Sequence, residues 1–188
     1  MDEKRKVILI TDGDYIAART IEVAARRVGG SCIRASRGNP TPLKGEQIAR
    51  LILKAQREPV LVMVDDRGEC GKGKGETVLE YLVKHPDLQV LGVIAVASNS
   101  ETNNGVRVDF SVDKDGRIIK GPVNKHGCPE PNDHKLLEGD TIEILQELTV
   151  PLVVGTGDIG KMQGKDDWRF GAQITTRVIR EIMVRSEE

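Results

Sequence analysis

Four aspartates in the first third of the chain could together bind a metal ion. Two of them follow the apolar residues 7–10, and the other two follow the apolar residues 60–64. Carboxylate oxygens are the ligands that hard cations such as Mg²⁺ and Ca²⁺ prefer. Helix capping also explains an acid placed before a helix, but four acids exceed what capping requires. The candidate ligand-binding residues are Asp12, Asp14, Asp65 and Asp66, with Asp12, Asp65 and Asp66 as the expected metal ligands.

A glycine-rich stretch directly after the second acid pair could bind an anion. Residues 68–75 nearly match the phosphate-binding pattern GxxxxGK[ST], but Gly75 stands where the Mg²⁺-binding hydroxyl is required. This argues against a nucleotide-hydrolysing loop. Backbone N–H groups at a helix start, with a lysine nearby, still attract carboxylate or phosphate. We therefore predict an anion contact at Gly73, Lys74 and Gly75.

A second glycine pattern, at residues 155–160, has the form GxGxxG. A dinucleotide-binding fingerprint needs a helix to open at once, followed by a further strand that carries an acid. Here a long polar loop follows instead, so we reject a dinucleotide site. Lys161 lies in that loop, and we predict that it contacts an anion above the aspartates, as the lysine of a receiver domain does.

Alternating strand and helix patterns must position these residues. Short unbroken apolar runs predict strands that are buried on both faces, and amphipathic runs predict helices between them. The expected helices cover residues 15–29, 45–56, 76–85, 140–148 and 171–185, and the expected strands cover residues 7–10, 31–35, 60–64, 88–97, 106–112 and 150–155.

These elements predict an α/β fold for the chain. The expected architecture is a doubly wound, mostly parallel sheet with helices on both faces, of the Rossmann, flavodoxin or toprim type, with one β-hairpin insertion turning at residues 114–117. Residues 1–188 are expected to form a single domain with an irregular excursion at about 98–139. Ligands bind such sheets outside the carboxyl ends of the strands, where the aspartates are expected to lie.

Composition and charge argue against several classes of partner and location. The formal net charge is −1, the pI is near 6.3 and only 3% of residues are aromatic, so we expect no nucleic-acid partner. The three cysteines form no CxxC pair, which indicates a reducing compartment. The start of the sequence is not typical of a signal peptide, and the longest apolar run, residues 90–97, is too short to span a bilayer. A soluble protein is expected.

Six short motifs in one order resemble the stage V sporulation protein AE family. The resemblance covers nearly the whole chain, and that family belongs to the operon that moves dipicolinic acid and Ca²⁺ in spore-forming bacteria. The motifs are Ile10–Asp14, Gly38–Thr41, Val64–Asp66, Val90–Ser98, Gly157–Met162 and Ile174–Thr176.

The resemblance implies a non-enzymatic accessory component that binds other stage V sporulation proteins, namely membrane channel subunits and a dipicolinate-binding subunit. The protein would be cytoplasmic or peripherally attached to the spore inner membrane, with homo-oligomers possible. It implies no catalytic residue. The residues themselves leave an enzyme open: a Mg²⁺-dependent phosphoryl or phosphodiester enzyme of receiver or toprim-like design, in which the aspartates hold the cation and Lys161 or Lys74 meets the anion.

Overall fold

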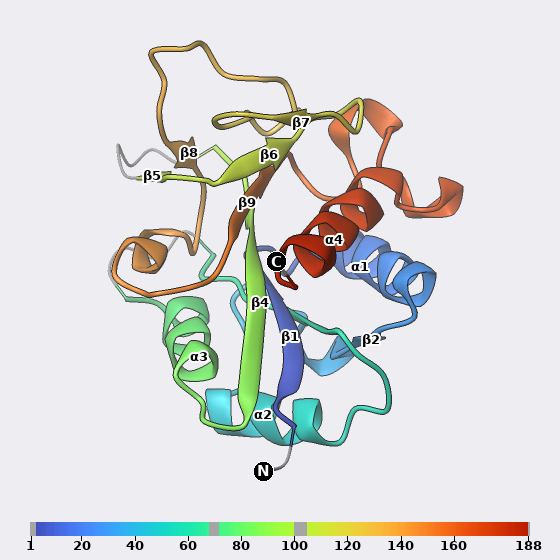
Figure 1. The fold of residues 1–188 in the computed structure, drawn as a ribbon, viewed down its shortest axis with the longest axis vertical. Helices are drawn as coiled ribbons and strands as arrows, with labels where there is room; N and C mark the ends of the chain where they lie inside the picture. Colours follow the sequence, from blue (N-terminus) through green and yellow to red (C-terminus); the bar gives the residue numbers. More distant parts are fainter. Residues whose placement is uncertain (1–2, 68–71, 100–104, 188) are drawn as a thin grey trace.

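A computed structural model describes residues 3–67, 72–99 and 105–187. Its centre is a seven-stranded sheet with the strand order β2-β3-β1-β4-β9-β6-β7 (Figure 1). Neighbouring strands in this sheet are parallel except β6 and β7, and β5 and β8 form a small antiparallel pair. The strands are β1 (Arg5–Ile10), β2 (Ser31–Cys32), β3 (Val60–Met63), β4 (Leu88–Val96), β5 (Gly105–Val106), β6 (Phe110–Val112), β7 (Ile118–Ile119), β8 (Leu137–Glu138) and β9 (Val153–Thr156).

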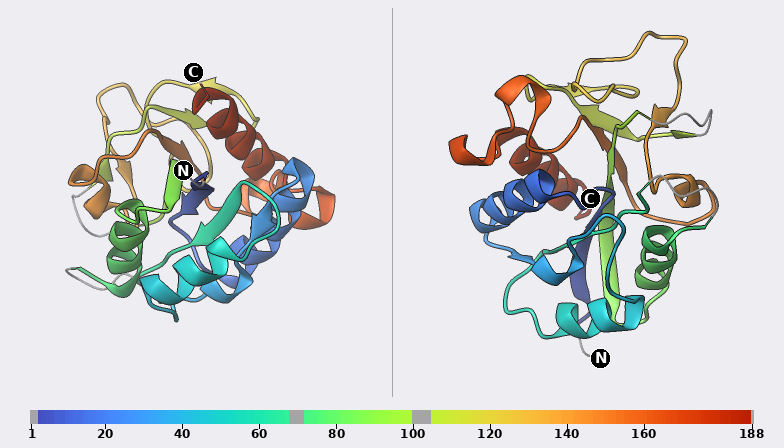
Figure 2. Two further views of the ribbon diagram at one scale, coloured as in Figure 1. Left: turned by 60° about the horizontal axis from the view of Figure 1, so that its bottom comes forward. Right: turned by 180° about the vertical axis from the view of Figure 1, so that it is seen from behind.

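Helices cover both faces of the sheet (Figure 2). Alternate residues of β1 enter opposite layers: Val7 and Leu9 pack with α2 and α3, whereas Ile8 and Ile10 pack with α1 and α4. The doubly wound α/β prediction is confirmed. The helices are α1 (Tyr15–Val28), α2 (Gly45–Leu53), α3 (Lys74–Val83) and α4 (Gln173–Arg185), with 3₁₀ turns η1 (Arg34–Ser36), η2 (Glu143–Gln146), η3 (Met162–Gly164) and η4 (Trp168–Phe170).

The region after β4 departs from the expected elements. The predicted hairpin at residues 114–117 is confirmed, because β6 and β7 pair antiparallel across that turn. The continuous strand predicted over residues 106–112 is wrong, because Asp109 separates β5 from β6 and both donates to and accepts from the backbone of Val153. The hairpin therefore extends the main sheet through β6 and β9. The predicted helix 140–148 is only the turn η2. That the chain forms one domain stays a prediction.

The start of α3 packs directly on the end of β3. A Cβ atom added to Gly75 would lie 2.7–2.8 Å from the backbone N, C and O atoms of Asp65. Gly75 therefore has a steric role: it lets the first turn of the helix approach the strand end that carries the aspartates.

Replacing Gly75 with alanine should lower the free energy of unfolding by about 1–3 kcal/mol, because the added methyl group overlaps rigid backbone. Helix propensity alone predicts the opposite sign, a gain of up to about 1 kcal/mol. Urea unfolding measures the difference. The control is Lys74→Ala at the exposed neighbouring position, which should stay within about 0.5 kcal/mol of the wild type. A Gly75→Ala protein as stable as the wild type would contradict this packing.

Candidate functional site

The carboxyl end of β1 is fixed to its neighbours on both sides. Thr11 donates its N–H to the carbonyl of Ile94 on β4 at 3.1 Å, and its Oγ1 accepts the N–H of Val96 at 3.0 Å. On the other side, the N–H of Gly13 donates to Oδ2 of Asp65, which follows β3, at 3.0 Å. The loop after β1 is therefore held across three strands before α1 begins.

Three carboxylates meet beside this loop. Asp12, Asp14 and Asp158 each place one oxygen within 4.8 Å of the others. Asp14 is also the N-cap of α1, since its Oδ1 accepts the N–H of Ala17 at 2.7 Å. Lys161 lies against two of the acids, with Nζ 3.3 Å from Asp14 Oδ2 and 2.9 Å from Asp158 Oδ2. We call Asp12, Asp14 and Asp158 the carboxylate trio.

Asp12 ionises less readily than an ordinary aspartate. Burial raises its pKa to about 8, and the negative charges of Asp14, Asp158 and Asp65 add to this effect, while the backbone N–H of Asp14 opposes it. Lys161 pairs with the other two members of the trio, and within the described residues no ion pair involves Asp12. Near neutral pH the site therefore holds a proton that a metal ion would displace.

The loop after β9 brings Asp158 and Lys161 to this place. The N–H of Asp158 donates to the carbonyl of Lys125 at 2.8 Å. Further along, the buried Asp166 accepts the N–H of Gly160 at 2.9 Å and is bound by Thr175 at the start of α4. Asp166 thus ties the loop to α4 and sets the position of its charged residues.

Asp65 lies nearby, but its oxygens already have partners. Besides Gly13, it accepts the N–H of Arg67 at 2.9 Å, and its own backbone exchanges hydrogen bonds with Thr41. Burial raises the pKa of Asp65 to about 6, since these N–H donors only partly compensate for desolvation and the charges of Asp66 and Asp140 oppose ionisation.

Asp66 turns away from the trio and caps α3. Its carboxylate accepts the N–H groups of Gly75 and Glu76, the latter at 3.1 Å. A Cβ on Gly73 would overlap the same carboxylate. Burial raises the pKa of Asp66, although these N–H donors and Thr141 oppose the shift. The N–H groups expected to bind an external anion therefore already bind an internal one.

The structure thus separates the predicted residues into two groups. It brings Asp12, Asp14 and Lys161 together, and places Asp65 and Asp66 against backbone N–H groups. Gly73 and Gly75 pack closely on the strand end, Lys74 is exposed, and residues 68–71 of the predicted anion loop lie outside the described residues. Both the metal and the anion assignments stay predictions.

Asp158 is the residue that sequence reasoning missed. It follows β9 after a single glycine, Gly157, just as Asp12 follows β1 after a single threonine. The signal was therefore an acid at a strand end, and it was hidden because the surrounding glycines resemble a dinucleotide motif.

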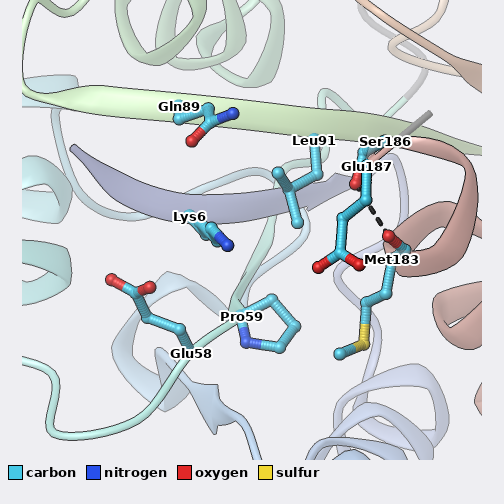
Figure 3. Close-up of a pocket in the computed structure, with 8 residues that line it drawn as sticks. All are labelled: Lys6, Glu58, Pro59, Gln89, Leu91, Met183, Ser186 and Glu187. Atoms are coloured by element: carbon cyan, nitrogen blue, oxygen red, sulfur yellow. Dashed lines mark hydrogen bonds between the residues drawn. The ribbon is translucent and has the colours of Figure 1, made fainter. Parts of the chain in front are cut away.

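The described residues also line two pockets outside the trio itself, and the larger one reaches Lys125, whose carbonyl accepts the N–H of Asp158. One, of about 440 Å³, adjoins the end of β4 and contains both imidazole and carboxylate groups; its polar lining includes Asn124, Lys125, His126, Glu130, His134 and Glu138. The other, of about 220 Å³, lies at the amino ends of the strands, and Lys6, Glu58 and Glu187 present charged groups to it (Figure 3). Their mixed charges select no single ligand class.

A family model described as stage V sporulation protein AE1 matches residues 6–186. The chain belongs to this family. Membership implies a role in sporulation. No curated protein and no solved structure matches the chain. Within residues 3–67, 72–99 and 105–187, this member of the family has no helix with the length and apolar character that a bilayer crossing requires.

Because the pKa of Asp12 is raised, the effect of Asp12→Asn on the stability of this family member should depend on pH. Between about pH 4 and pH 8 the folded protein keeps a proton that the unfolded chain has lost, so this group makes the fold less stable as pH rises. Asparagine cannot ionise and can still accept the N–H of Asp14. The Tm of Asp12→Asn relative to wild type should therefore rise by several degrees from pH 5 to pH 8.5.

This comparison is made by thermal unfolding in chelator-containing buffer. The exposed Asp87→Asn serves as the matched control and should show a constant offset across the same pH range. A constant offset for Asp12→Asn as well would contradict the raised pKa.

Removing the cap of α3 should destabilise the fold. Asp66→Ala leaves the N–H groups of Gly75 and Glu76 without their acceptor, at a cost of about 1–3 kcal/mol in the free energy of unfolding. Asp66→Asn keeps one acceptor oxygen and should cost less. Urea unfolding of the two variants tests this order, and equal stabilities would show that the cap contributes little.

Proposed function

We propose that the chain is a non-catalytic accessory component of the machinery that moves dipicolinic acid with Ca²⁺ in sporulation and germination, and that it acts by binding partner subunits. Two findings support this function: the family match, and the resemblance of its motifs to a protein of that operon. The proposed partners are the membrane channel subunits and the dipicolinate-binding subunit. The chain would attach to the membrane peripherally through them, and self-association is compatible with this role.

One structural observation carries the non-catalytic part of the proposal. Asp65 and Asp66, the acids that a receiver-like or toprim-like enzyme would need for its cation, are engaged with backbone N–H groups of their own fold. Such engagement is expected of acids that organise loops and cap helices. It supports docking over catalysis.

We assign the carboxylate trio as the place where a divalent cation would bind. Three oxygens from Asp12, Asp14 and Asp158, all within 4.8 Å of one another, suit the oxygen preference of Ca²⁺ or Mg²⁺. Lys161 competes with the cation, because its ammonium group already contacts two of the three acids. Cation binding therefore requires this side chain to move.

A thermal-shift series tests the cation assignment. Ca²⁺ or Mg²⁺ at a hundredfold excess over Kd should stabilise the protein by about 2.7 kcal/mol, a rise in Tm of roughly 5–10 °C. Asp12→Asn should remove this rise. Lys161→Gln should strengthen cation binding severalfold, because it removes the competing charge. Asp87→Asn is the control and should keep the wild-type rise in Tm. If Asp12→Asn also keeps that rise, the cation binds elsewhere.

A second candidate function rests on the position of Lys161. An ammonium group beside clustered carboxylates is the arrangement with which a Mg²⁺-dependent phosphoryl or phosphodiester enzyme would hold both cation and substrate anion. In that case Lys161→Gln should abolish metal-dependent hydrolysis of phosphate esters, whereas the accessory function predicts no hydrolysis in any variant.

Copurification of the chain with its proposed partner subunits completes the test. Under the accessory function, Asp12→Asn should retain its partners, because this proposal assigns the trio to a cation and not to the docking surface. Metal-dependent hydrolysis that is lost in Asp12→Asn would overturn the accessory function in favour of the enzyme.

A further inference from the structure

The two helix layers of the protein carry different charge. The surface formed by α1, α4, η4 and residues 34–37 has nine arginines, no lysine and two acids, Glu22 and Glu181, and Asp167 directly precedes η4. We call this surface the arginine face. In the opposite layer, α2, α3 and η2 contain two basic and four acidic residues. A formal net charge of −1 for the whole chain therefore conceals a cationic side.

The two helices of the arginine face lie side by side on one face of the sheet (Figures 1 and 2). Their buried residues face the sheet, which leaves their polar stripes on the same outer surface of the molecule. Tyr15, Arg19 and Arg26 recur at helical spacing along α1, and Arg177, Arg180 and Val184 do so along α4. The exposed charges of the two helices therefore lie on one side of the molecule.

Ion pairs within the protein involve only some of these arginines. Glu22 contacts Arg34 at 2.9 Å and Arg19 at 3.9 Å. Glu181 contacts Arg177 and Arg185, and Asp167 contacts Arg169. In the described part of the chain, no ion pair involves the four remaining arginines, which are all exposed: Arg26, Arg27, Arg37 and Arg180.

Aromatic side chains gather on the same surface. The chain has only five aromatic residues of the Phe, Tyr and Trp types. Phe170 is 73% exposed and Tyr15 is 62% exposed. Arg19 lies 4.8 Å above the ring of Trp168, and Arg37 lies 5.6 Å from that of Tyr15. Arginines of this face thus contact the rings of Tyr15 and Trp168, and the largest exposed fraction belongs to the apolar ring of Phe170.

We infer that the arginine face binds the surface of a membrane that contains anionic phospholipids. Guanidinium groups pair with lipid phosphates, and exposed Phe, Tyr and Trp side chains enter the headgroup region. The unpaired arginines are spread over helix exteriors, so a planar anionic surface can meet them together. Duplex nucleic acid would satisfy the arginines but offers no apolar phase for Phe170. This inference goes beyond the proposed function, because it concerns lipid and not protein subunits.

Cosedimentation of the purified chain with vesicles tests the inference. The chain should bind vesicles that contain phosphatidylglycerol, fail to bind pure phosphatidylcholine, and lose binding as salt is raised. Arg26→Gln combined with Arg180→Gln should weaken binding more than tenfold, at about fivefold for each arginine. Phe170→Ser should weaken it further.

Matched substitutions on α2 and at its C-cap, Lys54, provide the control. Arg50→Gln with Lys54→Gln removes the same charge, and Leu53→Ser removes an apolar side chain that is 40% exposed; these variants should bind like the wild type. Circular dichroism confirms that every variant is folded. Equal losses in both sets, absence of vesicle binding, or binding to duplex DNA without binding to vesicles would each overturn the inference. The assay contains only lipid and this chain, so a negative result would not bear on the proposed binding of partner subunits.

Discussion

The hydrogen bonds of Asp65 are the constraint on which the carboxyl edge of the sheet depends. This one residue joins the loop after β1 through Gly13, the segment before α2 through Thr41, and the turn that leaves β3 through Arg67. The start of α3 also packs against its backbone at Gly75. A carboxylate in this position is costly to bury, so it persists only because backbone N–H groups receive it. The hydrogen bond to Gly13 fixes the loop after β1, and Asp12 and Asp14 belong to this loop.

Charge is distributed unevenly both at the carboxyl edge of the sheet and between the two helix layers. At the edge of the sheet, carboxylates outnumber cations, and their charges add to the burial that raises the pKa of Asp12. Across the helix layers, arginines outnumber acids on α1 and α4, whereas acids outnumber basic residues on α2 and α3. Because these opposite charges lie on different sides of the sheet, they do not neutralise one another locally. A near-neutral composition therefore says little about what each face can bind.

Local patterns predicted much of the fold and only part of the site. Unbroken apolar runs identified β1, β3 and β4 because their side chains are buried on both faces, and the amphipathic run 15–29 identified α1, which Asp14 and Gly29 cap in the structure. The split of residues 106–112 depends on Asp109 meeting Val153, a contact between distant segments that no local pattern encodes. The same holds for Asp158, whose partners Asp12 and Asp14 lie far away in the sequence. Which carboxylates face one another is a property of strand order.

The loop that carries Lys161 also carries the only tryptophan of the chain, Trp168. Its ring packs under the guanidinium group of Arg19 on α1, while Lys161 bridges to Asp14 at the start of the same helix. The environment of the indole therefore depends on whether this loop is packed against α1. Its emission provides a built-in optical signal for any event that separates the two, without a label and without interference from a second tryptophan.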